Sequence, residues 1–202
     1  MDEFIAVFVV FFSVIDPIGT VPVYIAVTSQ VQKKERNLLA AKAVLFAGAI
    51  LLFFILVGEL ILDVLEIPLP AFQIAGGIVL FLFALSMIFG DSKPEQEVKL
   101  VRTATETAVY PLAVPSIASP GAMLAAVLLT ENAVYSVQEQ VVTSLAMLSV
   151  LLITLIFMFS SNFIVRIIGN SGASVVSRLM GLILASVAVT NVLEGIKIYF
   201  SL

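Results

Sequence analysis

Six apolar stretches, each long enough to cross a lipid bilayer as a helix, occupy most of this 202-residue chain. A transmembrane helix needs about 20 mostly apolar residues, and polar segments separate the six stretches. Charged residues make up only 12% of the chain, about half of what a soluble domain uses to cover its surface. The sequence therefore predicts an all-α membrane protein with six transmembrane helices. The expected spans are residues 4–28, 39–62, 69–89, 108–130, 141–165 and 177–199.

Two residue types that carry much of protein chemistry are missing, because the chain has no cysteine and no histidine. Disulfides and the usual metal centres are therefore excluded, and we expect neither a resident metal nor a cofactor. An enzyme would have to work with Ser or carboxylate groups alone, so we expect no enzyme. The chain has no basic patch for nucleic acid and no P-loop for ATP, which leaves the lipid bilayer and a small solute as expected partners.

The positions of Lys and Arg predict how the chain is oriented. Basic residues concentrate in cytoplasmic connections of membrane proteins. Nine of the ten lie near the first, third and fifth connections, and Lys197 near the C-terminus is the exception. We therefore expect these three connections in the cytoplasm and both termini outside. The nine residues are Lys33, Lys34, Arg36, Lys42, Lys93, Lys99, Arg102, Arg166 and Arg178.

The two halves of the sequence correspond at a shift of about 103 to 105 residues. Asp16 then matches Ser119, and Gly76 matches Gly181. Because each half holds an odd number of spans, the second half must enter the membrane from the opposite side. This pattern predicts a 3+3 inverted-topology repeat, which is typical of secondary transporters. The expected units are a first repeat at residues 1–90, a cytoplasmic connecting loop at 91–107 and a second, inverted repeat at 108–202.

The first and fourth spans each contain a proline-rich interruption near the middle. Proline lacks the backbone N–H and clashes with the preceding turn, so it breaks a helix. Asp16-Pro17 and Ser119-Pro120 also match an N-cap followed by proline at the first helical position. We expect each of these spans to consist of two half-helices that meet at the midplane, where the freed backbone groups are buried or line a cavity. The alternative is a simple proline kink in each span.

The two caps differ in charge, which predicts different chemistry at each. The N-terminus of a half-helix attracts anions, and at Ser119 the cap is neutral, so a substrate carboxylate is expected there beside Gly121. Asp16 is an anion and suits an ammonium, a sodium ion or a proton. A zwitterion such as an amino acid needs both poles, although a purely structural cap is the alternative for Asp16. The expected substrate-binding residues are Asp16, Pro17, Ile18, Gly19, Ser119, Pro120 and Gly121.

Six further polar side chains either hydrogen-bond between helices or line the cavity, and the sequence leaves the two uses open. They are Ser13, Ser86, Ser116, Asn162, Thr190 and Asn191. The glycines Gly76, Gly77 and Gly181 are expected to let helices approach closely. No metal ligand set is present, so the coupling ion is expected to be Na⁺ or H⁺ at Asp16.

Two motifs together resemble a known family over essentially the whole chain. Asp16-Pro17-Ile18-Gly19 precedes Val21-Pro22, and about a hundred residues later Pro111-Leu112-Ala113-Val114-Pro115 precedes Ser119-Pro120-Gly121-Ala122. This pair is similar to that of the MarC family of six-span membrane proteins, a relative of the LysE-type exporters. The resemblance implies transport of small neutral amino acids such as glycine and alanine, in a prokaryotic inner membrane.

The expected function is therefore a secondary transporter of small neutral amino acids, coupled to a cation and working by alternating access of one repeat against the other. A passive small-solute channel is one alternative, and it predicts flux without saturation. A regulatory membrane subunit is another, and it predicts no ligand-dependent stability. The sequence fixes neither the direction of transport nor the oligomeric state.

Overall fold

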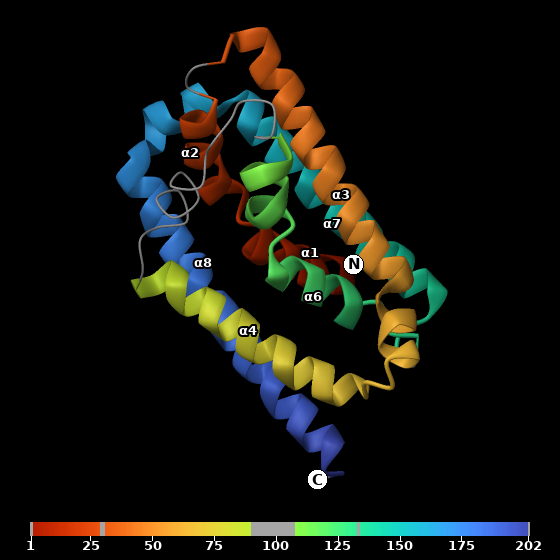
Figure 1. Ribbon diagram of the computed structural model, residues 1–202. Coiled ribbons are helices and arrows are strands. Elements are labelled where there is room, and N and C mark those ends of the chain that lie inside the picture. The colour runs from red at the N-terminus through yellow and green to blue at the C-terminus, as the bar shows by residue number, and fades with distance from the viewer. Residues whose placement is uncertain (1, 29–30, 90–107, 133, 202) are drawn as a thin grey trace.

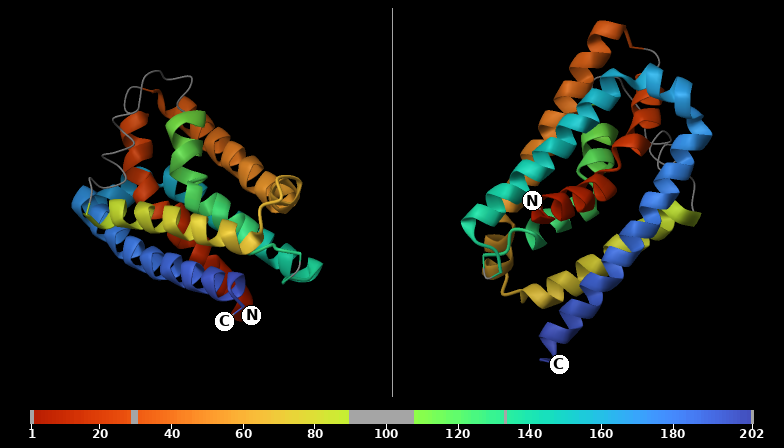
Figure 2. Two further views of the ribbon diagram at one scale, coloured as in Figure 1. Left: turned by 60° about the horizontal axis from the view of Figure 1, so that its bottom comes forward. Right: turned by 180° about the vertical axis from the view of Figure 1, so that it is seen from behind.

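The computed structural model describes residues 2–28, 31–89, 108–132 and 134–201, and these residues are helical with short connections and no strand. Two pairs of long helices lie on the outside (Figure 1). Four shorter segments lie between the pairs, as the view from behind also shows (Figure 2). The outer pairs are α3 (Lys33–Val64) with α7 (Val137–Phe159), and α4 (Leu69–Phe89) with α8 (Ser161–Tyr199). The inner segments are α1 (Asp2–Ile15), α2 (Pro17–Val27), η1 (Ala108–Ile117) and α6 (Pro120–Leu128).

Five helical segments of the described chain are long and apolar enough to cross a membrane. The predicted fourth span at 108–130 is not among them, and its helical residues are divided between η1 and α6, which have 10 and 9 residues. The all-helical membrane architecture predicted from sequence is confirmed at this level. The predicted connecting loop at 91–107 lies outside the described residues. The five segments are Phe4–Val27, Glu35–Val64, Leu69–Phe89, Val137–Phe159 and Ser174–Tyr199.

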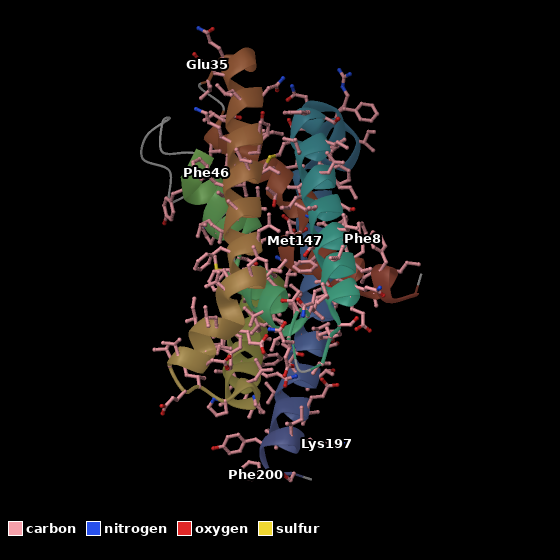
Figure 3. The ribbon with its side chains drawn as sticks, turned by 90° about the vertical axis from the view of Figure 1, so that its right-hand side faces the viewer. Phe8, Glu35, Phe46, Met147, Lys197 and Phe200 are labelled. Atoms are coloured by element: carbon pink, nitrogen blue, oxygen red, sulfur yellow. The ribbon has the colours of Figure 1, made fainter. Side chains whose placement is uncertain are left out.

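The long helices expose large apolar side chains, which suits a lipid environment. Leu45, Leu56 and Phe89 are 73%, 78% and 81% exposed. Exposed apolar side chains in such number along long helices are what contact with lipid requires. The buried core instead lies where the short inner segments meet the outer helices. Its largest members include Phe11 of α1 and Met147 of α7, and Met147 is labelled in Figure 3.

The first interruption is at Asp16, between α1 and α2. Asp16 has a left-handed backbone (φ 50°, ψ 69°), a conformation that Asp and Asn adopt more readily than most residues. Its side chain accepts a hydrogen bond from the backbone N–H of Gly19, and Pro17 is the first residue of α2. The predicted N-cap followed by proline is therefore confirmed.

The second interruption is at Ser119, between η1 and α6. Ser119 is extended (φ −71°, ψ 159°), its hydroxyl accepts from the N–H of Ala122, and Pro120 is the first residue of α6. This N-cap is confirmed as well. Both broken helices thus restart in the same way, with a polar cap and a proline.

The segment η1 that leads into the second interruption is more widely wound than an α-helix. The N–H of Ala118 donates to the carbonyl of Ala113, five residues earlier, at 2.8 Å. Tyr110 and Val114 have extended backbones within the segment, because each precedes a proline, whose ring disfavours the helical region for the residue before it. The peptide bond between Val114 and Pro115 is cis.

The boundary between the fifth and sixth predicted spans differs from the prediction. The chain turns at Ser160, directly after α7, and α8 begins at Ser161. The polar stretch 169–174, which lies between the predicted spans 141–165 and 177–199, is helical except at Gly169, which kinks α8 with φ 68° and ψ 171°. Glycine adopts this conformation without steric cost, so the polar stretch bends the helix instead of ending it.

Helices α4 and α8 come into close backbone contact at Gly77, Gly181 and Gly195. A Cβ atom added to Gly77 would lie 2.9 Å from the carbonyl oxygen of Ala188, and one added to Gly181 would lie 3.1 Å from that of Ala84. Gly77 precedes Ala84 along α4, whereas its partner Ala188 follows Gly181 along α8, so the helices are antiparallel. The close approach expected of Gly77 and Gly181 is confirmed.

Candidate functional site

The two interruptions meet in the interior of the protein. Asp16 is 1% exposed and Ser119 is fully buried. The hydroxyl of Ser119 donates a hydrogen bond of 3.2 Å to the carbonyl oxygen of Val14, in the last turn of α1. The two broken helices are therefore in direct contact with each other.

The carboxylate of Asp16 has one hydrogen-bond donor on each oxygen. The N–H of Gly19 donates to Oδ1 at 2.9 Å, and the hydroxyl of Ser177 donates to Oδ2 at 2.8 Å. Ser177 belongs to α8 and is itself 1% exposed. In the described part of the chain, no Lys or Arg side chain forms an ion pair with Asp16, so two neutral donors hold this buried carboxylate.

Only glycine fits at position 19, because the Asp16 carboxylate and the Ser177 hydroxyl lie so close to its backbone. A Cβ atom at this position would collide with the Asp16 carboxylate and with the Ser177 hydroxyl. The missing side chain therefore lets Ser177 reach Asp16. The sequence predicted Gly19 as part of the site, and the structure adds this steric reason.

A pair of hydroxyl groups forms another link between the two broken helices. The oxygens of Ser116 in η1 and Thr20 in α2 are 3.5 Å apart, the distance of a weak hydrogen bond. Thr20 also donates to the backbone carbonyl of Asp16 at 3.0 Å, and both hydroxyl-bearing residues are fully buried. The centre of the protein is thus polar on both sides of Asp16.

A cavity of about 150 Å³ adjoins the α6 side of this centre. Its lining is apolar except for Asn191 of α8, so one of the predicted cavity residues does line a cavity. Gly121 faces two lining residues, since an added Cβ would lie 2.5 Å from Leu80 and 3.0 Å from Val14. The full lining is Val10, Val14, Leu80, Leu124, Ala125, Leu128, Leu129, Val187 and Asn191.

The predicted site residues divide into a buried group and a peripheral group. Ile18 is half-buried and Pro120 is exposed, Asn162 and Thr190 are exposed on α8, and Ser86 is half-buried, with its hydroxyl bound to its own helix. These five do not join the central contacts. The buried group is Ser13, Asp16, Pro17, Gly19, Ser116, Ser119 and Gly121.

Sequence reasoning missed Ser177 and Thr20. Ser177 lies 161 residues after Asp16, at the predicted edge of the last span, and nothing in its neighbourhood distinguishes it from an interfacial serine. Thr20 carried a signal, because it lies one residue beyond the Asp16-Pro17-Ile18-Gly19 motif. Among the described residues, no group of three or more His, Cys, Asp or Glu side chains is arranged to hold a metal ion.

A second polar network lies near the C-terminal end of α3. The carboxylate of Glu59 accepts hydrogen bonds from the backbone and side-chain N–H groups of Asn132, and the amide of Gln140 donates to Asn132 at 3.0 Å. Partial burial raises the pKa of the Glu131 carboxyl above its ordinary value, and the charge of Glu59 raises that pKa further. This network ties α3 to the connection between α6 and α7.

The helices and their two interruptions define a polytopic α-helical membrane protein with a buried polar centre. A family model described as MarC family integral membrane protein matches residues 1–200. The chain belongs to the MarC family, and the resemblance carried by its two proline motifs is confirmed.

Three relatives span nearly the same length as this chain. A UPF0056 membrane protein of Methanocaldococcus jannaschii is 39% identical over 200 residues, which cover 98% of this chain and 97% of the relative. A UPF0056 membrane protein of Aquifex aeolicus is 31% identical, covering 98% and 95%. The UPF0056 inner membrane protein YhgN of Escherichia coli is 30% identical, covering 98% of each chain. No solved structure matches the chain.

Proposed function

We propose that this protein is a secondary transporter of small neutral amino acids of the glycine or alanine type, coupled to a cation. One observation carries the proposal: two half-helix N-termini with caps of different charge meet in the buried centre. Asp16 suits an ammonium group or a coupling ion, and the neutral cap at Ser119 leaves the positive end of α6 available for a carboxylate. The cavity beside Gly121 suits a small apolar side chain, because its walls are apolar except for one amide.

We further propose six spans arranged as a 3+3 inverted repeat, in which η1 with α6 forms the fourth span. The packing supports this arrangement, because four of the helix contacts form two matching pairs. Helix α1 packs on α7 and η1 packs on α3. Helix α2 packs on α7 and α6 packs on α3. When the two halves are exchanged, the contact of α1 with α7 becomes that of η1 with α3, and the contact of α2 with α7 becomes that of α6 with α3.

The glycine contacts of α4 and α8 support the same exchange at the level of single residues. Gly181 lies 104 residues after Gly77, and Ala188 lies 104 residues after Ala84. Gly77 faces the carbonyl of Ala188, and Gly181 faces the carbonyl of Ala84. The contact thus has the pseudo-two-fold form that an inverted repeat produces.

We propose that the ends rich in Lys and Arg face the cytoplasm and that the protein lies in an inner membrane. Glu35 of the first connection and Lys197 near the C-terminus lie at opposite ends of the molecule, which agrees with a C-terminus on the outside (Figure 3). The printed name of the Escherichia coli relative also contains the words inner membrane protein. The orientation itself rests on the positive-inside rule.

The described arrangement is closed around both caps, which suits one state of an alternating-access cycle. Asp16 and Ser119 are buried, and the Ser119 hydroxyl is engaged by Ala122 and Val14. A substrate carboxylate reaches the first turn of α6 only after that hydroxyl moves. Rocking of one repeat against the other would supply this movement.

The proposal is tested first by ligand-dependent stability. Thermal unfolding of the purified protein in detergent is measured with glycine, alanine, serine, leucine or glutamate, each in sodium and in potassium at two pH values. A ligand that binds only the folded state adds about 2.7 kcal/mol at a hundred times its Kd. We expect a higher Tm with the small neutral amino acids only. A folded protein whose Tm responds to none of them contradicts the proposal and favours a channel or a regulatory subunit.

The role of Asp16 is tested by Asp16→Asn in proteoliposomes. Asparagine also caps helices and adopts the left-handed backbone, so the fold should persist while the charge is lost. We expect uptake of glycine and alanine to be abolished or uncoupled from the cation gradient. Asp63→Asn, at an exposed carboxylate near the end of α3, is the matched control and should transport normally. Normal coupled uptake by Asp16→Asn would remove the role assigned to Asp16.

A further inference from the structure

The hydroxyl of Ser177 connects the last helix of the chain to the carboxylate of the first interruption. Ser177 is 1% exposed, and its hydroxyl donates to Oδ2 of Asp16 at 2.8 Å. Among the described residues, the other donor to this carboxylate is the backbone N–H of Gly19. Asp16 and Ser177 are 161 residues apart, so their contact joins the first half of the chain to the last helix.

The charge of Asp16 is not balanced by a basic side chain in the described part of the chain. A buried carboxylate inside a membrane protein is costly unless a positive charge or strong hydrogen bonds stabilise it. Two neutral donors meet only part of this demand. A cation beside the carboxylate would meet the rest, and hard cations bind oxygen ligands.

A hydroxyl group suits the carboxylate both without and with a bound cation, because it has one donor and two acceptor lone pairs. The Ser177 oxygen that now donates to Asp16 can turn its lone pairs toward a cation that contacts both groups, once the two oxygens move apart from their present 2.8 Å to admit it. An ammonium group and a monovalent metal ion share this requirement for a carboxylate and a neutral oxygen. An alanine at this position would offer neither the hydrogen bond nor the lone pairs.

The backbone of α2 is shaped for this contact. A Cβ atom on Gly19 would collide with both the Asp16 carboxylate and the Ser177 hydroxyl. Any side chain at this position would therefore separate the two oxygen groups. The absence of a side chain at Gly19 is thus what allows the carboxylate and the hydroxyl to lie within hydrogen-bond distance.

We propose that Ser177 and Asp16 jointly bind the positively charged group, either the substrate ammonium or a coupling metal ion, and that Ser177 determines its affinity. The inference rests on the proposed function for the presence of a cation and adds the residue that completes the cation pole. Because the ligands come from opposite halves of the chain, a bound cation would hold the two halves together in this arrangement.

The test compares the cation and amino-acid dependence of the Tm for the full-length protein and three variants. Ser177→Ala removes the hydroxyl, Ser177→Thr keeps it, and Ser186→Ala is the control on the same helix, at an exposed hydroxyl that donates to Leu182. One arm titrates NaCl, LiCl or KCl at constant ionic strength with choline chloride. The other arm titrates glycine, with propionate as the analogue that lacks an amino group.

We expect Ser177→Ala to raise the half-saturating concentration roughly tenfold or more, as the loss of a hydrogen bond to a charged group does. Ser177→Thr and Ser186→Ala should stay close to the wild type. An effect confined to the metal-ion arm identifies a metal ion, and an effect confined to glycine identifies the ammonium group. If Ser177→Ala does not fold, Ser177→Cys gives the same measurement, because a thiol is a poor ligand for hard cations.

Unchanged half-saturation in Ser177→Ala, with a responsive wild type, would overturn the inference and leave the proposed function intact. A folded wild type that responds to no cation and no amino acid would overturn both. The two failures are therefore distinguishable within one experiment.

Discussion

Ser119 caps two helices at once, because its hydroxyl accepts from Ala122 in α6 and donates to the carbonyl of Val14 at 3.2 Å in α1. The last carbonyls of a helix have no partner within that helix. The proline that follows Asp16 cannot supply a backbone N–H either. One interruption therefore provides a hydrogen bond that the other interruption needs, and this explains why both lie at the same place in the interior.

Replacing Ser119 by alanine is expected to destabilise the fold. Loss of an N-cap costs about 1 kcal/mol, and the carbonyl of Val14 loses its donor as well. We expect Ser119→Ala to lower the Tm by at least roughly 2–4 °C in detergent. Ser186→Ala removes an exposed hydroxyl that binds only its own helix, so it should leave the Tm nearly unchanged. Equal Tm values for the two variants would show that the Ser119 cap adds nothing to stability.

The backbone contact of α4 with α8 predicts that a methyl group at Gly77 or Gly181 destabilises the protein. In Gly77→Ala the new Cβ would meet the Ala188 carbonyl, and backbone cannot move aside as a flexible side chain can. Overpacking of this kind costs about 1–3 kcal/mol, and we expect Gly181→Ala to behave alike. In the control Gly48→Ala the nearest atom is a Leu151 methyl at 3.3 Å, which can shift. Thermal unfolding checks this prediction, because Gly77→Ala and Gly181→Ala should lower the Tm more than Gly48→Ala. An equal loss of Tm in Gly48→Ala and Gly77→Ala would contradict it.

The Glu131 carboxyl predicts a pH-dependent stability. Burial first, and the charge of Glu59 second, raise its pKa above the ordinary value of 4.5. A raised carboxyl pKa means that the folded protein favours the protonated form. The associated stability is present below about pH 4.5 and is lost as the pH rises through the raised pKa.

We therefore expect Glu131→Gln to raise the Tm at pH 7 and to match the wild type below about pH 4.5. The gain should stay below about 1 kcal/mol, because water screens a largely accessible group. Glu194→Gln, at an exposed carboxylate on α8, is the control. A Tm difference that grows as the pH falls would reverse the assigned sign.

The orientation can be measured directly, because the natural chain contains no cysteine to interfere. Val134→Cys places a thiol in the connection between α6 and α7, where Val134 is 62% exposed. Asn37→Cys places one at the start of α3, also at an exposed position. We expect a membrane-impermeant maleimide to label Val134→Cys in intact cells and Asn37→Cys only after permeabilisation. The reverse pattern would invert the proposed topology.

The sequence was most informative where backbone chemistry acts locally. Proline after a polar cap predicted both interruptions, because the missing N–H and the fixed φ act within one turn whatever the surroundings. Hydropathy likewise located the long helices, since a bilayer requires about 20 apolar residues in a row. Both kinds of signal depend on neighbouring residues, so folding does not change them.

The sequence was least informative where distant segments meet. The contact of Ser177 with Asp16 depends on how α8 packs against α2, and no local pattern records that packing. The turn at Ser160 was missed for a related reason. Polar residues occur both there and near Gly169, and only the packed structure decides which stretch ends a helix and which bends one.

Gly77 faces the carbonyl of Ala188, and Gly181 faces the carbonyl of Ala84. This pair of reciprocal contacts has the form of an isologous interface, in which a surface binds a second copy of itself. Each of the two helices offers a glycine and, one or two turns away, the carbonyl that receives the partner's glycine. Two separate copies of one half, inserted in opposite directions, would form this contact without any new surface. A peptide link between such copies would fix their ratio at one to one within a single chain. The contacts at the interface would stay the same.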